Sequence, residues 1–228
     1  MASHKEFQRF AKTYSRYSLI QARVAKALAN KISGNFSYVV DLGCGSGGFF
    51  NAYKKPFVSY LAIDISPEML EIHPTANGAE TMIGNFNDSK LFEALKKREF
   101  ELIVSSSALQ WSQNLDWTLS QIASFKRPVA LSLFTSGTFK TLHEIVGISS
   151  PIRSKEETVR LLQKHFNVKI DTLKFKLYFS DKLSMLRYIK QSGVSGGKRK
   201  LSITQTRKIL RDYPLFFLEF EVVIANNA

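Results

Sequence analysis

The sequence predicts a doubly wound α/β fold: a mostly parallel seven-stranded sheet with helices on both faces. Two observations carry this prediction. Short β-branched runs alternate with stretches of helical periodicity over residues 34–135, and the first two runs each lead through a glycine-rich or Ser-Pro turn into a helix. Consecutive strand–helix units of this kind place their strands parallel, with right-handed crossovers between them.

The remaining elements follow from the same patterns. Apolar spacing predicts two helices in residues 1–33, with a break near Ser15 and Ser18, and Gly34 ends the second. After the strands of YVVDL and SYLAID, further strands are expected at 80–83, 100–105, 128–134, 168–178 and 214–225. Helices are expected at 89–97, 115–124, 138–146, 155–165, 181–191 and 202–211. Ser66 is the expected N-cap of the helix after the second strand, with Pro67 at its first position.

We interpret the chain as one domain, because it has no internal repeat, low-complexity tract or linker-like run. Its expected parts are N-terminal helices (1–33), a cofactor-binding core (34–135), a helical lid with the sixth strand (136–200), and a terminal helix with a sheet-closing strand (201–228). The closing strand is expected to complete a hairpin, and GVSGGKRK to form a basic loop before the last helix.

Composition excludes several classes of protein. The 228 residues are 44% hydrophobic and 22% charged, which is ordinary for a globular protein. No window approaches the ~18 apolar residues that a membrane span needs, and charges occupy the place of a signal peptide's apolar core. The sequence therefore favours a soluble cytoplasmic protein. Cys44 is the single cysteine and the four histidines are scattered, so neither an internal disulfide nor a metal site is expected.

The net charge of +13 invites an anionic partner such as nucleic acid, a membrane headgroup or an acidic protein. The charge is uneven. Residues 1–150 contain 16 basic and 12 acidic residues, whereas residues 151–228 contain 16 basic and 7 acidic residues. Most of the excess therefore lies in the last third of the chain.

The most informative motif is DLGCGSGG at residues 41–48, where glycines let backbone N–H groups approach a ligand closely. Gly43, Gly45 and Gly48 match the dinucleotide pattern G-x-G-x-x-G, and Asp64 follows Gly43 by 21 residues, where an acid meets ribose hydroxyls. The alternative pattern is D-x-G-x-G-x-G. A carboxylate at Asp41 would oppose a pyrophosphate but suits the sulfonium and α-amino groups of S-adenosylmethionine. The sequence therefore favours the methyl donor over NAD.

Polar residues at the ends of later strands extend this expected site. Asn85 and Phe86 follow the third strand, where an amide and a ring can hold adenine, although Asn85 alone also suits an ordinary turn. The loop after the fourth strand reads SSSALQW and lacks both N-P-P-[YF] and a Pro-Cys nucleophile, which disfavours methylation of bases by those routes. Trp111 in this loop suits either the site or the core.

Several segments resemble a known family. DLGCGSGG, AIDISPEML and FELIVSSSALQW are similar to class I methyltransferases. GTFKTLHEIV, MLRYIKQSGVSGG and the terminal YPLFFLEFEVVIA, with FQRFAKTYSRYSLIQARVAKAL near the start, resemble more narrowly the malonyl-acyl-carrier-protein O-methyltransferases of biotin synthesis. The glycine loop is specific only to the superfamily, and ALQW, TLHE and IKQSGVSGG carry the narrower resemblance.

The resemblance implies roles for individual residues. Asp41, Gly43 and Gly45 would hold the methionine portion of the donor, Asp64 the ribose and Asn85 the adenine edge. Cys44, Ile65, Phe86 and Ser106 complete the expected cofactor site. Two departures stand out: Asn85 replaces the family's usual acid after Gly84, and KRPVAL lacks the glycine of the turn before the fifth strand.

The acceptor side is less well determined. A malonyl carboxylate is already ionised at neutral pH, so its methylation needs orientation and removal of water rather than a general base. The resemblance places Tyr14 over the cofactor, although Tyr14 also fits a core stripe with Phe7 and Phe10. A cation would orient the acceptor, and Arg127, Lys140, His143 and Arg153 are candidates. Tyr188 and Lys190 are weaker acceptor-side candidates. His143, in the expected lid, is the preferred acceptor-side residue.

The resemblance implies a malonyl-acyl carrier protein as partner. Lys198, Arg199 and Lys200, with Arg207, Lys208 and Arg211, would form the surface on which this acidic protein docks. Two alternatives stay open: a methyltransferase acting on RNA or another small acceptor, and a non-catalytic protein that binds the cofactor as a regulator.

Overall fold

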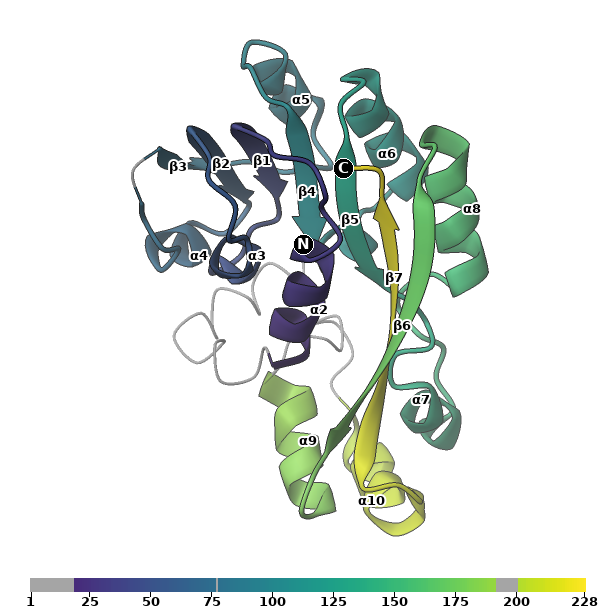
Figure 1. The fold of residues 1–228 in the computed structure, drawn as a ribbon. Helices are drawn as coiled ribbons and strands as arrows, with labels where there is room; N and C mark the ends of the chain where they lie inside the picture. Colours follow the sequence, from purple (N-terminus) through teal and green to yellow (C-terminus); the bar gives the residue numbers. More distant parts are fainter. Residues whose placement is uncertain (1–18, 77, 192–200) are drawn as a thin grey trace.

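The computed structural model describes residues 19–76, 78–191 and 201–228, and there it forms a seven-stranded sheet with helices on both faces (Figure 1). The strand order is β3-β2-β1-β4-β5-β7-β6. The first five strands are parallel, and β7 runs antiparallel to β5 and β6. The strands are β1 (Tyr38–Leu42), β2 (Ser59–Asp64), β3 (Ala79–Ile83), β4 (Leu102–Ser106), β5 (Val129–Phe134), β6 (Lys169–Tyr178) and β7 (Phe217–Asn226). The predicted doubly wound fold is confirmed.

Helices alternate with the strands as the sequence predicts. They are α2 (Leu19–Ala29), α3 (Gly48–Ala52), α4 (Pro67–Glu71), α5 (Ser89–Leu95), α6 (Leu115–Ser124), α7 (Lys140–Val146), α8 (Lys155–His165), α9 (Lys182–Gln191) and α10 (Ile203–Asp212), with a 3₁₀ turn at Leu109–Trp111. The predicted first helix, with Tyr14, and the basic loop at 193–200 lie outside the described residues. None of the described helices is long and apolar enough to cross a membrane.

Alternate residues of the central strands pack on opposite faces, because successive side chains of a strand point to opposite sides of the sheet. One face packs against α2 and α3, and the other against α5, α6 and α8. The first cluster includes Val24, Leu28, Val39, Phe49, Tyr60 and Leu102, and the second includes Val40, Leu61, Phe92, Ile103, Leu119 and Leu162. Both faces of β1, β2, β4 and β5 are therefore buried, as their largely apolar sequences require, whereas the edge strand β3 is more exposed.

Local signals explain two of the element boundaries. The Ser66 hydroxyl accepts a hydrogen bond from the Met69 N–H, and Pro67 occupies the first turn of α4, so the predicted cap is confirmed. Helix α7 begins two residues later than predicted. Phe139 before it has φ +58°, and the Thr138 hydroxyl donates to the Glu221 carbonyl, so Thr138 belongs to the junction with β7.

The turn before β5, which lacks a glycine, contains a residue with a strained backbone. Lys126 has φ +53°, in the left-handed region that favours glycine, and its N–H donates to the Ala123 carbonyl at 3.0 Å. Arg127 and Pro128 then lead into β5. The turn therefore keeps a glycine-like backbone with a lysine side chain.

The C-terminal strands differ from a simple hairpin. β6 and β7 pair antiparallel from Lys169 opposite Asn226 to Tyr178 opposite Phe217, but α9 and α10 lie between them in the chain. β7 inserts between β5 and β6, so β6 is the edge strand. Figure 1 shows this long β6–β7 ribbon extending beyond the carboxyl ends of the parallel strands, with α7, α9 and α10 beside its far end.

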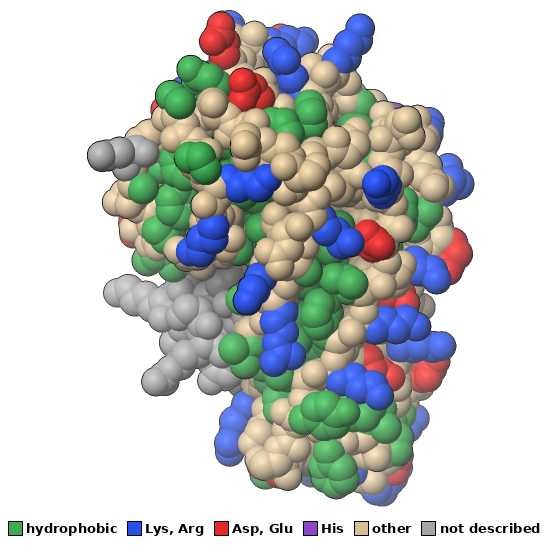
Figure 2. All heavy atoms as spheres, viewed as in Figure 1, with side chains coloured by type: hydrophobic (Ala, Val, Ile, Leu, Met, Phe, Trp, Pro, Cys, Tyr) green, Lys and Arg blue, Asp and Glu red, His purple; other side chains and the backbone are tan. Residues whose placement is uncertain are grey.

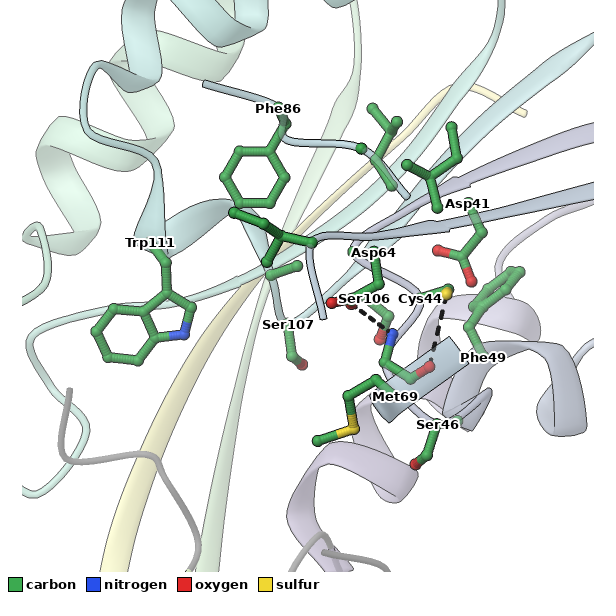
Figure 3. A pocket seen from close by; sticks show the side chains of 18 of the residues that line it. Asp41, Cys44, Ser46, Phe49, Asp64, Met69, Phe86, Ser106, Ser107 and Trp111 are labelled. Atoms are coloured by element: carbon green, nitrogen blue, oxygen red, sulfur yellow. Dashed lines mark hydrogen bonds between the residues drawn. The ribbon is translucent and has the colours of Figure 1, made fainter. Parts of the chain in front are cut away.

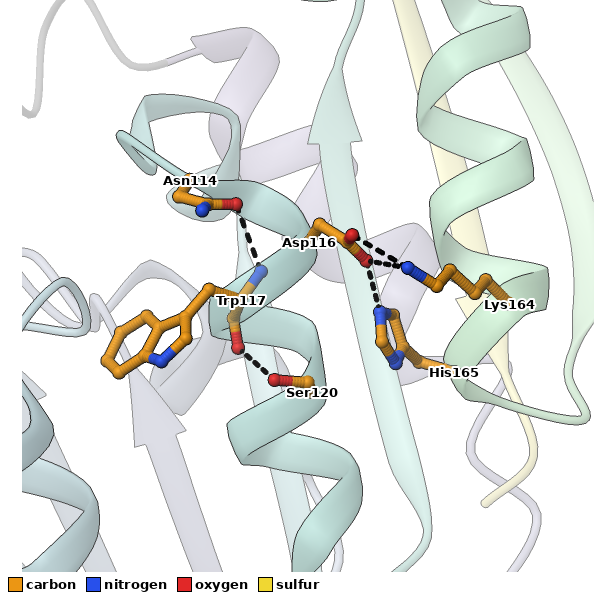
Figure 4. A network of polar contacts seen from close by, with 6 residues as sticks. All are labelled: Asn114, Asp116, Trp117, Ser120, Lys164 and His165. Atoms are coloured by element: carbon orange, nitrogen blue, oxygen red, sulfur yellow. Dashed lines mark hydrogen bonds and ion pairs between the residues drawn. The ribbon is translucent and has the colours of Figure 1, made fainter.

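A polar network joins α6 to α8 on the other side of the sheet (Figure 4). The Asp116 carboxylate accepts from Lys164 Nζ at 2.7 and 2.9 Å and lies 2.5 Å from His165 Nε2. Lys164 and His165 hold the pKa of Asp116 below its usual range, because both interactions favour the carboxylate. This network is remote from the cavity described below, so we assign it a structural role.

Candidate cofactor site

A cavity of about 630 Å³ opens at the carboxyl ends of β1, β2, β3 and β4 (Figure 3). Open α/β sheets bind ligands at this edge, where loops from adjacent strands diverge. All nine residues predicted to contact the cofactor line the cavity: Asp41, Gly43, Cys44, Gly45, Asp64, Ile65, Asn85, Phe86 and Ser106. The structure therefore brings the predicted cofactor residues together at one place.

The glycine loop after β1 is anchored to the neighbouring strand β2 by backbone hydrogen bonds. The N–H groups of Gly43 and Cys44 donate to the Ile63 carbonyl at 2.7 and 2.9 Å. Gly43 has φ +76°, and a Cβ there would lie 2.3 Å from the Ala108 Cβ in the loop after β4. A larger residue at Gly43 would push these two loops apart. This position therefore needs glycine both for its backbone angle and for a close approach.

Asp41 is fully buried at the base of the cavity. Its Oδ2 accepts a hydrogen bond from the Tyr60 hydroxyl at 2.7 Å, whereas Oδ1 is buried with no hydrogen-bond partner in the described part of the chain. Burial raises the pKa of Asp41 to about 7, against the opposing effect of the Tyr60 hydrogen bond. A buried carboxylate with one unsatisfied oxygen is a site for a cationic or N–H-bearing ligand group.

Asp64 closes the glycine loop from the neighbouring strand. Its Oδ2 accepts from the Gly45 N–H and its Oδ1 from the Ser66 N–H, both at 2.9 Å. These two hydrogen bonds fix the side chain at the cavity wall, where the predicted contact with a ribose would be made.

Cys44 is a cavity residue with an inert thiol. Burial strongly raises the pKa of the Cys44 thiol, with Asp41 and Asp64 adding to the effect, and Sγ contacts the Gly45 carbonyl. Cys44 therefore contributes shape and apolar surface rather than a nucleophile.

The loop after β3 gives Asn85 the turn role that the sequence also allowed. The Asn85 Oδ1 accepts from both the N–H and the side-chain amide of Asn87, at 2.9 and 3.1 Å. Asn85 and Phe86 both line the cavity, so this turn presents its outer edge and the Phe86 ring to a ligand. The contact of Asn85 with adenine stays a prediction.

The preferred acceptor-side histidine lies away from this cavity. His143 is on α7, packed edge-on against Phe139, and it is not among the lining residues. Burial lowers the pKa of His143, and its Nδ1 is buried with no partner in the described chain. His143 therefore favours the neutral form, and its contact with an acceptor stays a prediction.

Two of the other candidate cations, Arg153 and Lys140, have partners of their own. Arg153 donates to the Ser112 and Gln113 carbonyls and pairs with Glu157, and Lys140 faces Glu144 at 3.9 Å. No lysine, arginine or histidine of the described residues lines the cavity, while two carboxylates do. This charge balance opposes a pyrophosphate and suits a positively charged ligand, which strengthens the prediction of S-adenosylmethionine over NAD.

The structure adds lining residues that the sequence did not identify. Gln21 of α2 lines the cavity, and Ser107 and Gln113 extend the wall beyond Ser106. Trp111, whose role the sequence left open, also lines the cavity (Figure 3). Ser107 and Gln113 could have been predicted from the sequence, because both follow β4 at the edge of the sheet where the cavity opens. Helix α2 gave no such signal, because its approach depends on packing between distant parts of the chain.

The comparisons with known proteins agree with this site. A methyltransferase-domain family model matches residues 40–130. The malonyl-[acyl-carrier protein] O-methyltransferase of Chlorobium luteolum is 30% identical over 210 residues, covering 86% of this chain and 80% of that protein. The enzyme of the same name from Acinetobacter baylyi is 28% identical, covering 83% and 78%. The match to that from Priestia megaterium, at 28% identity, covers 61% of this chain and spans about half of that relative's length, 53%.

Solved structures show the same fold at low identity. A SAM-dependent methyltransferase from Thermotoga maritima has a TM-score of 0.57 at 14% identity and covers 99% of this chain and 100% of its own. Geranyl diphosphate methyltransferase, solved with SAM, has a TM-score of 0.52 at 14% identity and covers 91% and 85%. These likenesses support the fold alone.

Proposed function

The chain belongs to the malonyl-[acyl-carrier protein] O-methyltransferase family of class I S-adenosylmethionine-dependent methyltransferases, and from that premise we propose that it methylates the free carboxylate of a malonyl thioester on an acyl carrier protein. The product would be the methyl ester that starts pimeloyl synthesis for biotin. The observation that carries the chemistry is a cavity lined by two carboxylates and, among the described residues, by no basic group. The relatives' names suggest the acceptor.

The residues present fit the cofactor. The unsatisfied Asp41 Oδ1 would accept from the α-amino group, Asp64 would hold the ribose, and the Asn85–Phe86 turn would hold adenine. When bound, S-adenosylmethionine supplies an electrophilic methyl group on a sulfonium. Cys44, Ile65 and Ser106 would shape the walls around it.

The acceptor carboxylate is its own nucleophile. With a donor bound, one carboxylate oxygen would accept the methyl group, S-adenosylhomocysteine would be the leaving group, and no proton would be taken up or released. A site for this reaction needs no general base. None of the cavity's described residues is a histidine, and its thiol has a raised pKa. The protein's task is to orient the carboxylate in line with the methyl group and to exclude water from it. Tyr14 and His143 remain proposed contributors to that orientation.

The partner would dock on the basic C-terminal third. Lys198, Arg199 and Lys200 belong to this proposed surface but lie outside the described residues, while Arg207, Lys208 and Arg211 lie on α10. Reversing the three charges at 198–200 is expected to weaken binding of the carrier protein and to leave donor affinity unchanged.

The deciding experiment is transfer of a labelled methyl group to malonyl carrier protein, with recovery of an alkali-labile methyl ester. Malonyl carrier protein without donor and unacylated carrier protein are the controls. Absence of the ester, with labelling of RNA that weakens steeply with salt, would favour the RNA alternative. Binding of donor without transfer to any acyl thioester would favour the regulatory alternative.

The cofactor residues have a separate test. Asp64→Ala should abolish binding of S-adenosylhomocysteine in calorimetry while the circular dichroism spectrum stays native. Unchanged affinity would overturn the assignment of Asp64.

A further inference from the structure

Large apolar side chains are exposed together at the far end of the β6–β7 ribbon. Of the ten large hydrophobic residues exposed in the described chain, five fall between residues 178 and 216: Tyr178, Leu183, Ile203, Leu210 and Phe216. Tyr178 and Phe216 are 67% and 59% exposed. Scattered exposed hydrophobics need no explanation, but a contiguous group marks an interaction site.

Contacts between neighbouring residues join the segments that carry four of these side chains, and we call this region the ribbon tip: Tyr178, Leu183, Leu210 and Phe216. The Phe179 N–H donates to the Phe216 carbonyl at 2.8 Å, and the Tyr178 ring lies tilted against that of Phe217, with 5.2 Å between the ring centroids. Lys182 Nζ donates to the Leu210 carbonyl at 2.9 Å, which joins the start of α9 to the end of α10. Figure 2 shows hydrophobic side chains gathered at the lower end of the molecule with lysine and arginine beside them.

The surroundings of the ribbon tip are strongly basic. Residues 174–189 and 203–217 contain seven lysines and arginines but only two acidic residues, Asp181 and Asp212. Two copies of this chain meeting at the ribbon tip would bring like charges together. A partner with acidic side chains around an apolar contact would instead be complementary.

The ribbon tip also lies on the side where the cavity opens. The parallel strands end with their carboxyl termini toward α7, α9 and α10, and the ribbon continues past them in that direction (Figure 1). A carrier bound there would hold its acyl group on the same side of the sheet as the cofactor site.

We propose that the ribbon tip is the apolar centre of the docking surface for the acidic carrier protein, with the basic residues of α9 and α10 as its rim. The inference rests on the proposed function and extends it, because it assigns binding to apolar residues outside the basic cluster at 198–200. Buried aromatic residues carry most of the free energy in such interfaces, and rim charges chiefly set the association rate.

The test compares methylation of the same malonyl group on the carrier protein and on coenzyme A. Tyr178→Ser with Phe216→Ser should raise KM for malonyl carrier protein about tenfold, as expected for loss of interface anchors, and leave KM for malonyl-coenzyme A unchanged. Val58→Ser, which removes a 61% exposed side chain far from the tip, is the matched control. Lys208→Glu should slow association with the carrier, most strongly at low salt.

Three results would overturn the docking proposal. The first is an unchanged KM for the carrier-bound acceptor. The second is a wild-type dimer in light scattering that the double variant dissociates. The third is wild-type binding to anionic phospholipid vesicles, but not to carrier protein, that the variant loses. If the wild type methylates neither acceptor, the proposed function fails, and calorimetry with the carrier protein alone still decides whether the tip binds it.

Ser107 carries a second, independent inference. It has φ +60°, in the left-handed region that is unfavourable for a serine, and its Oγ is buried with no hydrogen-bond partner in the described chain. Its N–H donates to the Ser132 carbonyl and its carbonyl accepts from Gln110 Nε2, so the backbone is fixed on both sides. Figure 3 shows the hydroxyl in the cavity between Trp111 and Met69.

We infer that the Ser107 hydroxyl donates a hydrogen bond to the acceptor's malonyl group. Apart from Ser106, the groups expected to hold the donor come from the ends of β1, β2 and β3, which leaves the loop after Ser106 for the acceptor. A hydroxyl orients a carboxylate without the strong pairing of a lysine or arginine, and the described lining has neither. This inference also rests on the proposed function.

Ser107→Ala should raise KM for malonyl-coenzyme A about tenfold, the effect of losing one hydrogen bond to a charged group, and leave the affinity for S-adenosylhomocysteine unchanged. Ser107→Thr should retain part of the acceptor affinity. Ser124→Ala, on the exposed end of α6, is the control. An unchanged KM, or a loss of donor affinity equal to the loss of acceptor affinity, would overturn the assignment.

Discussion

Replacing Asp41 by asparagine tests the electrostatics of the cofactor site most directly. The carboxyl is fully buried, and its pKa rises from 3.8 to about 7. The donor-free folded protein therefore holds a proton on Asp41 up to about pH 7, whereas the unfolded chain loses it near pH 4. The free energy of unfolding must fall as the pH rises through this window and then level off.

The size of the effect follows from the two pKa values. The difference between 3.8 and about 7 corresponds to about 4 kcal/mol. Asparagine cannot ionise, and its carbonyl can still accept the hydrogen bond from Tyr60. We expect Asp41→Asn to match the wild type near pH 4 and to be more stable by up to about 4 kcal/mol at pH 8.

Donor binding should change in the opposite direction. A ligand ammonium favours the ionised carboxylate, so binding releases a proton below pH 7, and wild-type affinity should fall about tenfold for each pH unit below that value. Asp41→Asn should bind S-adenosylhomocysteine more weakly at pH 7, without this pH dependence. Calorimetry in two buffers of different ionisation enthalpy would count the protons released.

Urea unfolding of donor-free protein between pH 4 and 8 provides the stability measurement. Glu71→Gln, at an exposed site, controls for the removal of one negative charge. Parallel stability curves for wild type and Asp41→Asn, together with no proton release on binding, would refute the reasoning.

Three further predictions concern single contacts. Tyr60→Phe removes the hydrogen bond that lowers the pKa of Asp41, so calorimetry should show the affinity profile for S-adenosylhomocysteine shifted to higher pH. Gly43→Ala places a Cβ 2.3 Å from that of Ala108, and both thermal stability and donor affinity should fall sharply. Lys126→Gly relieves a φ of +53° and should raise the free energy of unfolding by up to about 1 kcal/mol in urea titration; a lower value would assign the lysine side chain a stabilising role.

The local pattern of the sequence determined the order of the elements and the glycine loop. Each described strand or helix spans eleven residues or fewer, so its periodicity can be recognised without knowing what the element packs against. The same holds for the cap at Ser66 and for the acids at the ends of β1 and β2. Residues at strand ends converge because parallel strands bring their carboxyl ends to one edge.

Only the tertiary structure decided how these residues are paired. Tyr60 reaches Asp41 because the register sets Tyr60 opposite Val39, on the face that Asp41 shares. No periodicity in either strand encodes that contact. Likewise, Ser107 lines the cavity and His143 does not. The positions of their loops depend on contacts between residues far apart in the sequence, and therefore on the packing of the whole sheet.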